Sequence, residues 1–310
     1  TAAELERRLG VDVDRDFLEA DGRLRRAGLD KSGVSSQYRL LDRHDADTQA
    51  KDGYYWKSFD FRTDAGTANI FRFPLGPVFA ANPFPRLAFE HAGGELIFSL
   101  PNALQGYLLV NAKGDRIDAG PSDVVSDDLK TSGTSLIVTG LSCMSCHRSG
   151  MIPFPDRLLG GTRAAVGGDA RDKLDRFTTT QAEWDKILAR DQARFLKALE
   201  EATSVFLQVG ADKAKPVRDF AEPVAALSRL YQKDLDIGAV AVELTTDAKT
   251  LRTLIQAGAG LQRLGLGVVV EGGTIKRAEW DSLKESTLST FHKASLELRR
   301  GTPYRVYRTE

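Results

Sequence analysis

The feature that most constrains this chain is the run Cys143-Met144-Ser145-Cys146-His147, because it predicts a large group that the fold must enclose. Two cysteines separated by two residues and followed at once by a histidine form the pattern of covalent haem attachment. At this spacing both thiols reach the vinyl groups along one porphyrin edge, and the adjacent imidazole binds the iron as proximal ligand. We therefore expect one haem c, attached through both cysteines and ligated by the histidine.

Two other kinds of site also use a Cys-x-x-Cys pair. A thioredoxin-like redox pair usually has Pro or an aromatic residue between its cysteines, whereas this chain has Met144 and Ser145 there. A structural zinc site needs two further ligands, commonly a second pair of Cys or His. The chain has only two cysteines, and its other histidines are scattered singly, at His44, His91 and His292. The pattern favours haem c over a dithiol or metal site.

Composition sets the remaining limits. A chain of 310 residues is long enough for two compact domains or one large one. Lys plus Arg equals Asp plus Glu at 43 each, so no net positive field attracts nucleic acid, and no nucleic-acid partner is expected. The longest apolar run, residues 264–270, is short and interrupted by Gly265 and Gly267, so we expect no transmembrane segment.

The hydrophobic pattern divides the chain into three regions. Residues 1–32 are predicted to be N-terminal helices, since apolar residues recur at three- and four-residue intervals up to Leu29. Residues 33–170 are predicted to be β-rich and to carry the haem motif. The expected strands are residues 37–41, 54–61, 87–90, 95–100 and 107–110, with a hairpin turn near Gly93-Gly94.

Residues 171–310 form the third region, which is predicted to be helical. Thr180 and Glu183 make a capping box before a long amphipathic helix. Shorter helices are expected at residues 217–232, 235–244, 247–257 and 277–298. The predicted fold class is α+β, with a β-rich N-terminal and central layer that leads into the haem segment and a mostly helical C-terminal half.

The ligand on the second face of the haem decides whether the iron only moves electrons or also binds small molecules. The chain lacks the methionine that small cytochromes c supply some tens of residues after the motif. Met151 lies four residues after His147, and four extended residues span at most about 14 Å, so a packing role is favoured for it. The candidate distal ligands are His91 and then His44, with His292 less favoured. An open site or an unusual ligand such as Lys remains the alternative.

The attachment motif resembles that of c-type cytochromes. A wider likeness covers residues 53–61, 89–95, 100–107, 140–151 and 272–277, which are similar to segments of large single-haem cytochrome c proteins exported by bacteria, whose function is unassigned. The resemblance implies haem ligation after export, and hence a periplasmic or otherwise exported protein. No signal segment is visible at the start of this sequence, and an upstream lipid anchor is compatible with it.

Three functions compete at this point. Electron transfer between exported redox partners requires the fewest sequence features beyond the haem motif. A peroxidase- or oxygenase-type enzyme with an open distal site would need an acid–base residue near the bound oxidant. Sequence proximity alone suggests Glu90, Glu95, Gln105 and His91, and no catalytic residue is assigned. A redox- or gas-sensing module is the third possibility, and we expect electron transfer.

Overall fold

The structure is a computed structural model, and it describes residues 1–46, 53–127, 135–162, 165–221, 226, 233–282 and 288–301. The chain divides into two compact units, Thr1–Ala226 and Leu227–Glu310, which are described separately. The first unit contains a six-stranded sheet and the second is helical. The predicted α+β class, with its mostly helical C-terminal half, is confirmed.

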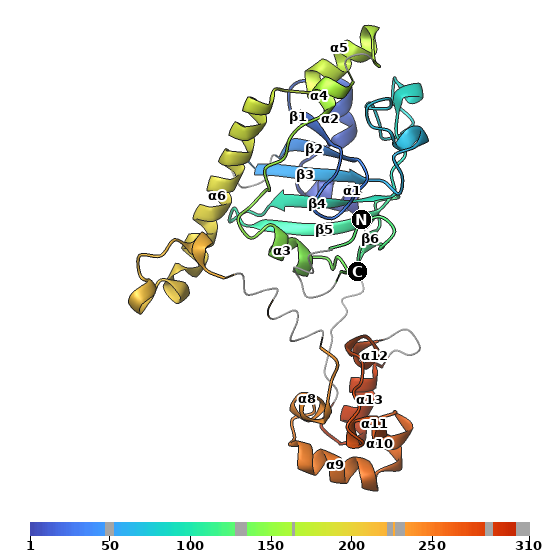
Figure 1. Ribbon diagram of the computed structural model, residues 1–310, viewed down its shortest axis with the longest axis vertical. Helices are drawn as coiled ribbons and strands as arrows, with labels where there is room; N and C mark the ends of the chain where they lie inside the picture. Colours follow the sequence, from blue (N-terminus) through green and yellow to red (C-terminus); the bar gives the residue numbers. More distant parts are fainter. Residues whose placement is uncertain are drawn as a thin grey trace. The chain divides into compact units, whose positions relative to one another are not determined.

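One antiparallel sheet organises the first unit (Figure 1). Its six strands lie side by side in the order of the sequence, so each pairs with its neighbour in the chain. Antiparallel neighbours of this kind need no crossover connection. The strands are β1 (Leu24–Leu29), β2 (Arg39–Ala46), β3 (Gly53–Asp60), β4 (Gly93–Ser99), β5 (Gln105–Asn111) and β6 (Arg116–Ile117).

Both faces of this sheet are buried, and alternate residues of each strand point to opposite faces. We call one side the motif face, because Trp56 and Ile97 pack there with Met151 and Phe154, which follow the motif. The other side is the far face. It is built on residues such as Leu40, Phe59, Leu96 and Val110.

Helices from both ends of the first unit cover the far face. Helices α1 (Ala2–Arg8) and α2 (Val13–Glu19) contribute Ala2 and Phe17 to its core clusters. Helices α4 (Leu158–Gly161) and α5 (Gly168–Phe177) add Leu158, Leu174 and Phe177. Two short 3-10 helices, η1 (Gly66–Ala68) and η2 (Pro85–Leu87), lie in the long connection between β3 and β4.

The motif face is covered by helix α3 (Leu141–Cys146) with the segment after it and by the long helix α6 (Gln181–Leu207). Thr180 caps α6 by accepting a hydrogen bond from the backbone N–H of Glu183 at 3.3 Å, at the position of the predicted capping box. Trp184 and Leu188 of α6 pack into the core of this face.

Two sequence predictions about the first unit are wrong in detail. Residues 24–29 form strand β1 rather than the end of a helix, since β2 supplies a complete hydrogen-bonding edge from Arg39 to His44. Pairing across the sheet therefore overrides a three- and four-residue spacing. The predicted strand at residues 87–90 is not formed, and Leu87 instead ends the helix η2.

The second unit is built from short helices around Trp280. They are α8 (Ile237–Glu243), α9 (Ala248–Ala257), α10 (Ala259–Arg263), α11 (Gly267–Val270), α12 (Arg277–Asp281) and α13 (Thr290–Glu297). Glu243 accepts hydrogen bonds from the Arg277 guanidinium and from Trp280 Nε1. Leu235 and Ile275 form an isolated antiparallel bridge.

Of the predicted helix at residues 217–232, Val217–Asp219 form a 3-10 helix, η4, in the first unit, and most of the rest lies outside the described residues.

Two further observations complete the fold. A short 3-10 helix, η3 (Gly210–Asp212), follows α6. In the part of the chain that the structure describes, no helix combines the length and the apolar character needed to cross a membrane.

A buried ion pair attaches α6 to the sheet. Asp191 accepts hydrogen bonds from Arg43 Nε at 2.8 Å and Nη2 at 3.1 Å, and from Trp56 Nε1 at 3.3 Å. Both charged side chains are almost completely buried. Because desolvated charges are costly when unpaired, this contact determines where α6 lies on the motif face.

We predict that Asp191→Ala lowers the free energy of unfolding by about 3–5 kcal/mol, because it leaves the buried Arg43 charge without its main partner. Urea denaturation followed by circular dichroism measures this change. Asp185→Ala is the matched control, since Asp185 lies exposed on the same helix; it should change the value by less than about 0.5 kcal/mol. Equal effects of the two substitutions would contradict the prediction.

Candidate functional site

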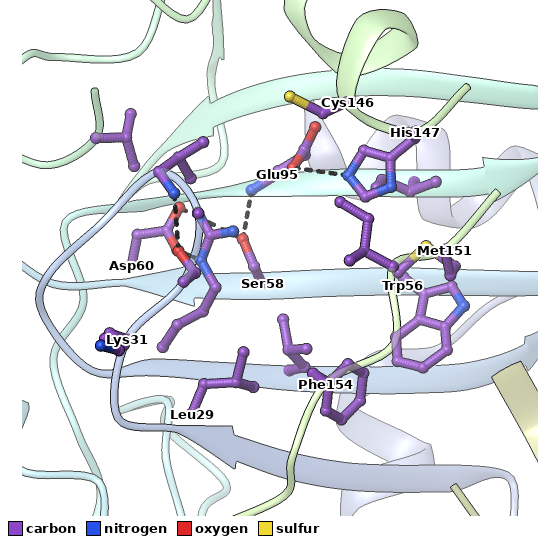
Figure 2. Close-up of a pocket in the computed structure, with 18 of the residues that line it drawn as sticks. Leu29, Lys31, Trp56, Ser58, Asp60, Glu95, Cys146, His147, Met151 and Phe154 are labelled. Atoms are coloured by element: carbon purple, nitrogen blue, oxygen red, sulfur yellow. Dashed lines mark hydrogen bonds and ion pairs between the residues drawn. The ribbon is translucent and has the colours of Figure 1, made fainter. Parts of the chain in front are cut away.

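A cavity of about 580 Å³ lies between the motif face and the segment that carries the Cys-x-x-Cys-His run (Figure 2). Cys143, Cys146 and His147 all line it, so the structure brings the three predicted attachment residues to one place. The sheet contributes a mainly apolar wall. Its apolar lining residues are Leu29, Leu41, Trp56, Ile97 and Leu109.

Helix α3 presents the two cysteines. Gly140, at a φ of +80°, precedes the helix in a backbone conformation that favours glycine. Ser142 Oγ then accepts a hydrogen bond from the backbone N–H of Val138 at 2.8 Å and ties the start of the helix to the preceding chain. Positions three apart on a helix share one face, so Cys143 and Cys146 both reach the cavity. Both cysteines are free thiols.

His147 follows α3 and is held by its own loop. Its Nδ1 lies 3.2 Å from the carbonyl oxygen of Gly150, which we assign as an N–H donating to that oxygen. Gly150 has a φ of +97°, a conformation that other residues rarely adopt. With the proton on Nδ1, the lone pair of Nε2 is free to bind a metal, and such a second hydrogen bond is what orients metal-binding histidines.

The Cys143 thiol is not poised for redox chemistry. Its burial raises its pKa, and the nearby Glu95 carboxylate raises it further. Reactive cysteines of dithiol redox proteins instead have lowered pKa values in electropositive surroundings. The environment of Cys143 therefore disfavours this residue as the nucleophile of a dithiol pair.

A polar cluster interrupts the apolar wall of the cavity. Arg39 of β2 donates to Asp60 of β3 at 2.6 Å, and both side chains are buried. Burial acts to lower the pKa of Arg39, but the carboxylates of Asp60 and Glu95 raise it overall. Burial raises the pKa of Asp60, and Arg39 opposes this rise. Ser58 lies between these groups and accepts a hydrogen bond from the backbone N–H of Glu95 at 2.8 Å.

Arg39, Ser58 and Asp60 line the cavity but were not predicted as site residues. The available signal was the occurrence of polar side chains at alternate positions inside strands that are otherwise apolar. The register pairs Arg39 with Asp60 and Leu41 with Ser58, which places all of them on the motif face. Without the register, these positions do not identify a common site.

The two histidines predicted as distal ligands do not line the cavity. His91 packs perpendicular to Phe59 on the far face, with ring centroids 5.0 Å apart. His44 alternates with Leu41 and Arg43 on β2, so it also lies on the far face, where its Nδ1 is 2.8 Å from Asp16 Oδ2. The sheet separates both rings from His147, and neither is retained as a ligand candidate.

The remaining candidates are placed as follows. His292 belongs to α13 of the second unit, where its Nδ1 lies 2.7 Å from Ser289 Oγ. Met151 packs in the motif-face core with Trp56 and Phe154, in agreement with the packing role expected for it, and it also lines the cavity. Within the described ranges, no three or more His, Cys, Asp or Glu side chains are grouped so as to hold a metal ion.

Comparisons with known proteins do not add to this picture. No family model, no curated protein and no solved structure matches the chain. The functional assignment therefore depends on the residues of the cavity and on their geometry.

His91 provides a pH-dependent test of the far face. Burial lowers its pKa to about 4, and the Lys57 charge adds to the effect. The unfolded chain, with a His pKa near 6.5, binds more protons than the folded chain between about pH 4 and 6.5, so folding stability falls as the pH falls through this window.

We predict that the stability of the native chain, compared with that of His91→Gln, decreases by roughly 1 kcal/mol for each pH unit below about pH 6. Urea denaturation of both proteins at a series of pH values between neutral and mildly acidic measures the difference. A difference that does not change with pH would show that His91 is solvated in the folded protein.

Proposed function

We propose that this protein binds one haem c covalently and transfers electrons to a redox partner. Cys143 and Cys146 would form the thioethers, and His147 would bind the iron. The observation that carries the proposal is that these three side chains line one cavity, while the Gly150 carbonyl leaves His147 Nε2 free. The haem would supply one-electron redox chemistry, and the chain would hold and orient it.

The cavity is compatible with a large, flat, mainly apolar group. Its volume of about 580 Å³ lies within the range of small-molecule and cofactor sites, roughly 300–1,000 Å³. Trp56, Ile97 and Phe154 offer apolar surface to a porphyrin, whereas Lys31 and Arg157, which also line the cavity, offer positive charge to its carboxylates.

Electron transfer is favoured by apolar side chains exposed on the motif segment. Met144, inside the motif, is 38% exposed, and Ile152, which also lines the cavity, is 51% exposed. Exposed apolar residues beside a cofactor suit a transient contact with a partner protein. Haem attachment of this kind further implies an exported, periplasmic protein, as the resemblance to c-type cytochromes does.

A second candidate function is small-molecule chemistry at an exchangeable sixth position, as in a haem enzyme or gas sensor. The polar cluster of Arg39, Ser58, Asp60 and Glu95 favours it, since a carboxylate can transfer a proton to a bound ligand and a guanidinium can stabilise developing negative charge. A pure electron carrier does not need such a cluster.

The first test is haem attachment itself. We predict that the chain, produced in a bacterial periplasm with a haem-ligation system, retains the mass of one haem after denaturation. Cys143→Ser combined with Cys146→Ser should abolish this retention, since no thioether can form. Met144→Ser, at an exposed position inside the same motif, should retain it. Haem-free native chain under conditions that load another single-haem cytochrome would refute the proposal.

The second test separates the two functions. Optical and electron paramagnetic resonance spectra are recorded for the oxidised and reduced holoprotein, with and without carbon monoxide. Electron transfer predicts iron that does not respond to carbon monoxide. High-spin iron that binds the gas readily would instead support the second candidate and would rule out simple electron transfer.

A further inference from the structure

Glu95 is the side chain that faces His147 across the cavity (Figure 2). It lies in β4, and its register partner in β5 is Leu109, another cavity residue. The Oε2 atom of Glu95 is 4.0 Å from Nε2 of His147, and only about an eighth of either side chain is exposed to solvent. The ring nitrogen that is free to bind a metal is thus the one that points to this carboxylate.

The backbone holds Glu95 in place. Its N–H donates to Ser58 Oγ at 2.8 Å. The preceding residue, Gly94, allows β4 to approach β3 closely, because a Cβ atom there would lie 2.0 Å from the carbonyl oxygen of Ser58. A residue other than glycine would force the two strands apart. Glu95 therefore reaches the cavity from a rigid part of the sheet rather than from a loop.

The charge of Glu95 is directed at the cavity. The guanidinium of Arg39, whose pKa the Glu95 carboxylate helps to raise, donates to Asp60 at 2.6 Å. Oε2 of Glu95 lies 4.0 Å from Nε2 of His147, and this contact is an ion pair only when the imidazole is protonated. A carboxylate that is held beside a metal-binding nitrogen and shares its neighbouring cation, Arg39, with Asp60 is placed to bind a metal or a proton.

We propose that Glu95, through Oε2, occupies the sixth coordination position of the ferric iron, opposite His147. This inference rests on the proposed haem attachment. Bonds from metals to nitrogen and oxygen ligands are about 2 Å long, so an iron bound to Nε2 lies within bonding reach of an oxygen 4.0 Å from that nitrogen. Carboxylate is a hard, anionic ligand, so it stabilises ferric more than ferrous iron.

The test compares Glu95→Gln with Glu90→Gln in the loaded holoprotein. Glu90 is the matched control, because it is an exposed glutamate five residues away that does not line the cavity. Both variants should retain covalent haem. The ferric absorption spectrum of Glu95→Gln should differ from that of the native protein, and azide should bind its ferric iron roughly tenfold or more tightly, since a competing anion is removed. Glu90→Gln should match the native protein in both respects.

A native ferric spectrum and native azide affinity in Glu95→Gln would overturn the inference. If that variant does not fold, the native protein decides the matter in water enriched in the magnetic isotope of oxygen. Broadening of its ferric resonance signal would show that water holds the sixth position, which also overturns the inference, whereas the absence of broadening supports it. Native chain without covalent haem would instead refute the proposed function itself.

Discussion

The first unit depends on one constraint, namely that both faces of a single antiparallel sheet are buried. Side chains of each strand alternate between the two faces, so every position is assigned either to the motif face or to the far face. Aromatic residues such as Phe59 and Phe89 close the far face. On the motif face, Trp184 packs against Trp56, and the ion pair between Arg43 and Asp191 attaches α6 to the sheet. The cavity lies where this face is covered by the segment that carries the Cys-x-x-Cys-His run rather than by α6.

That arrangement explains how the candidate site combines local and distant residues. Cys143, Cys146 and His147 form one short run, and Gly150 orients the imidazole from within the same loop. Opposite them the sheet presents both apolar side chains and a charged cluster that includes Glu95. An apolar wall suits the body of a porphyrin, and a few placed polar groups near its centre decide reactivity. In the proposed electron-transfer function the apolar part of the wall would hold the haem. In the proposed role of Glu95 the charged cluster would provide the ligand of its iron.

Much of the fold followed from sequence patterns, and the failures have identifiable causes. The strands around Trp56, Ile97 and Leu109 were predicted because their apolar runs are bounded by turn residues. Strand β1 was assigned to a helix, since its six residues acquire their conformation by pairing with β2 rather than by propensity. His91 was favoured as a ligand because it lies at the mouth of the hairpin predicted near Gly93-Gly94, where a rigid scaffold could direct it towards the haem. The structure places it against Phe59, on the other side of the sheet.

The sequence alone determined the most specific prediction about this protein, the attachment of haem c at Cys143, Cys146 and His147. Such a motif is readable because all its groups lie within five residues, so that local geometry suffices. Tertiary structure decided which side chain faces His147. Which side chain that is depends on the register of β4, a strand about fifty residues before His147 in the chain. A shift of one residue in this register would move each side chain of β4 from one face of the sheet to the other. For that reason a glutamate in β4, and neither histidine of the far face, lies opposite the candidate iron ligand.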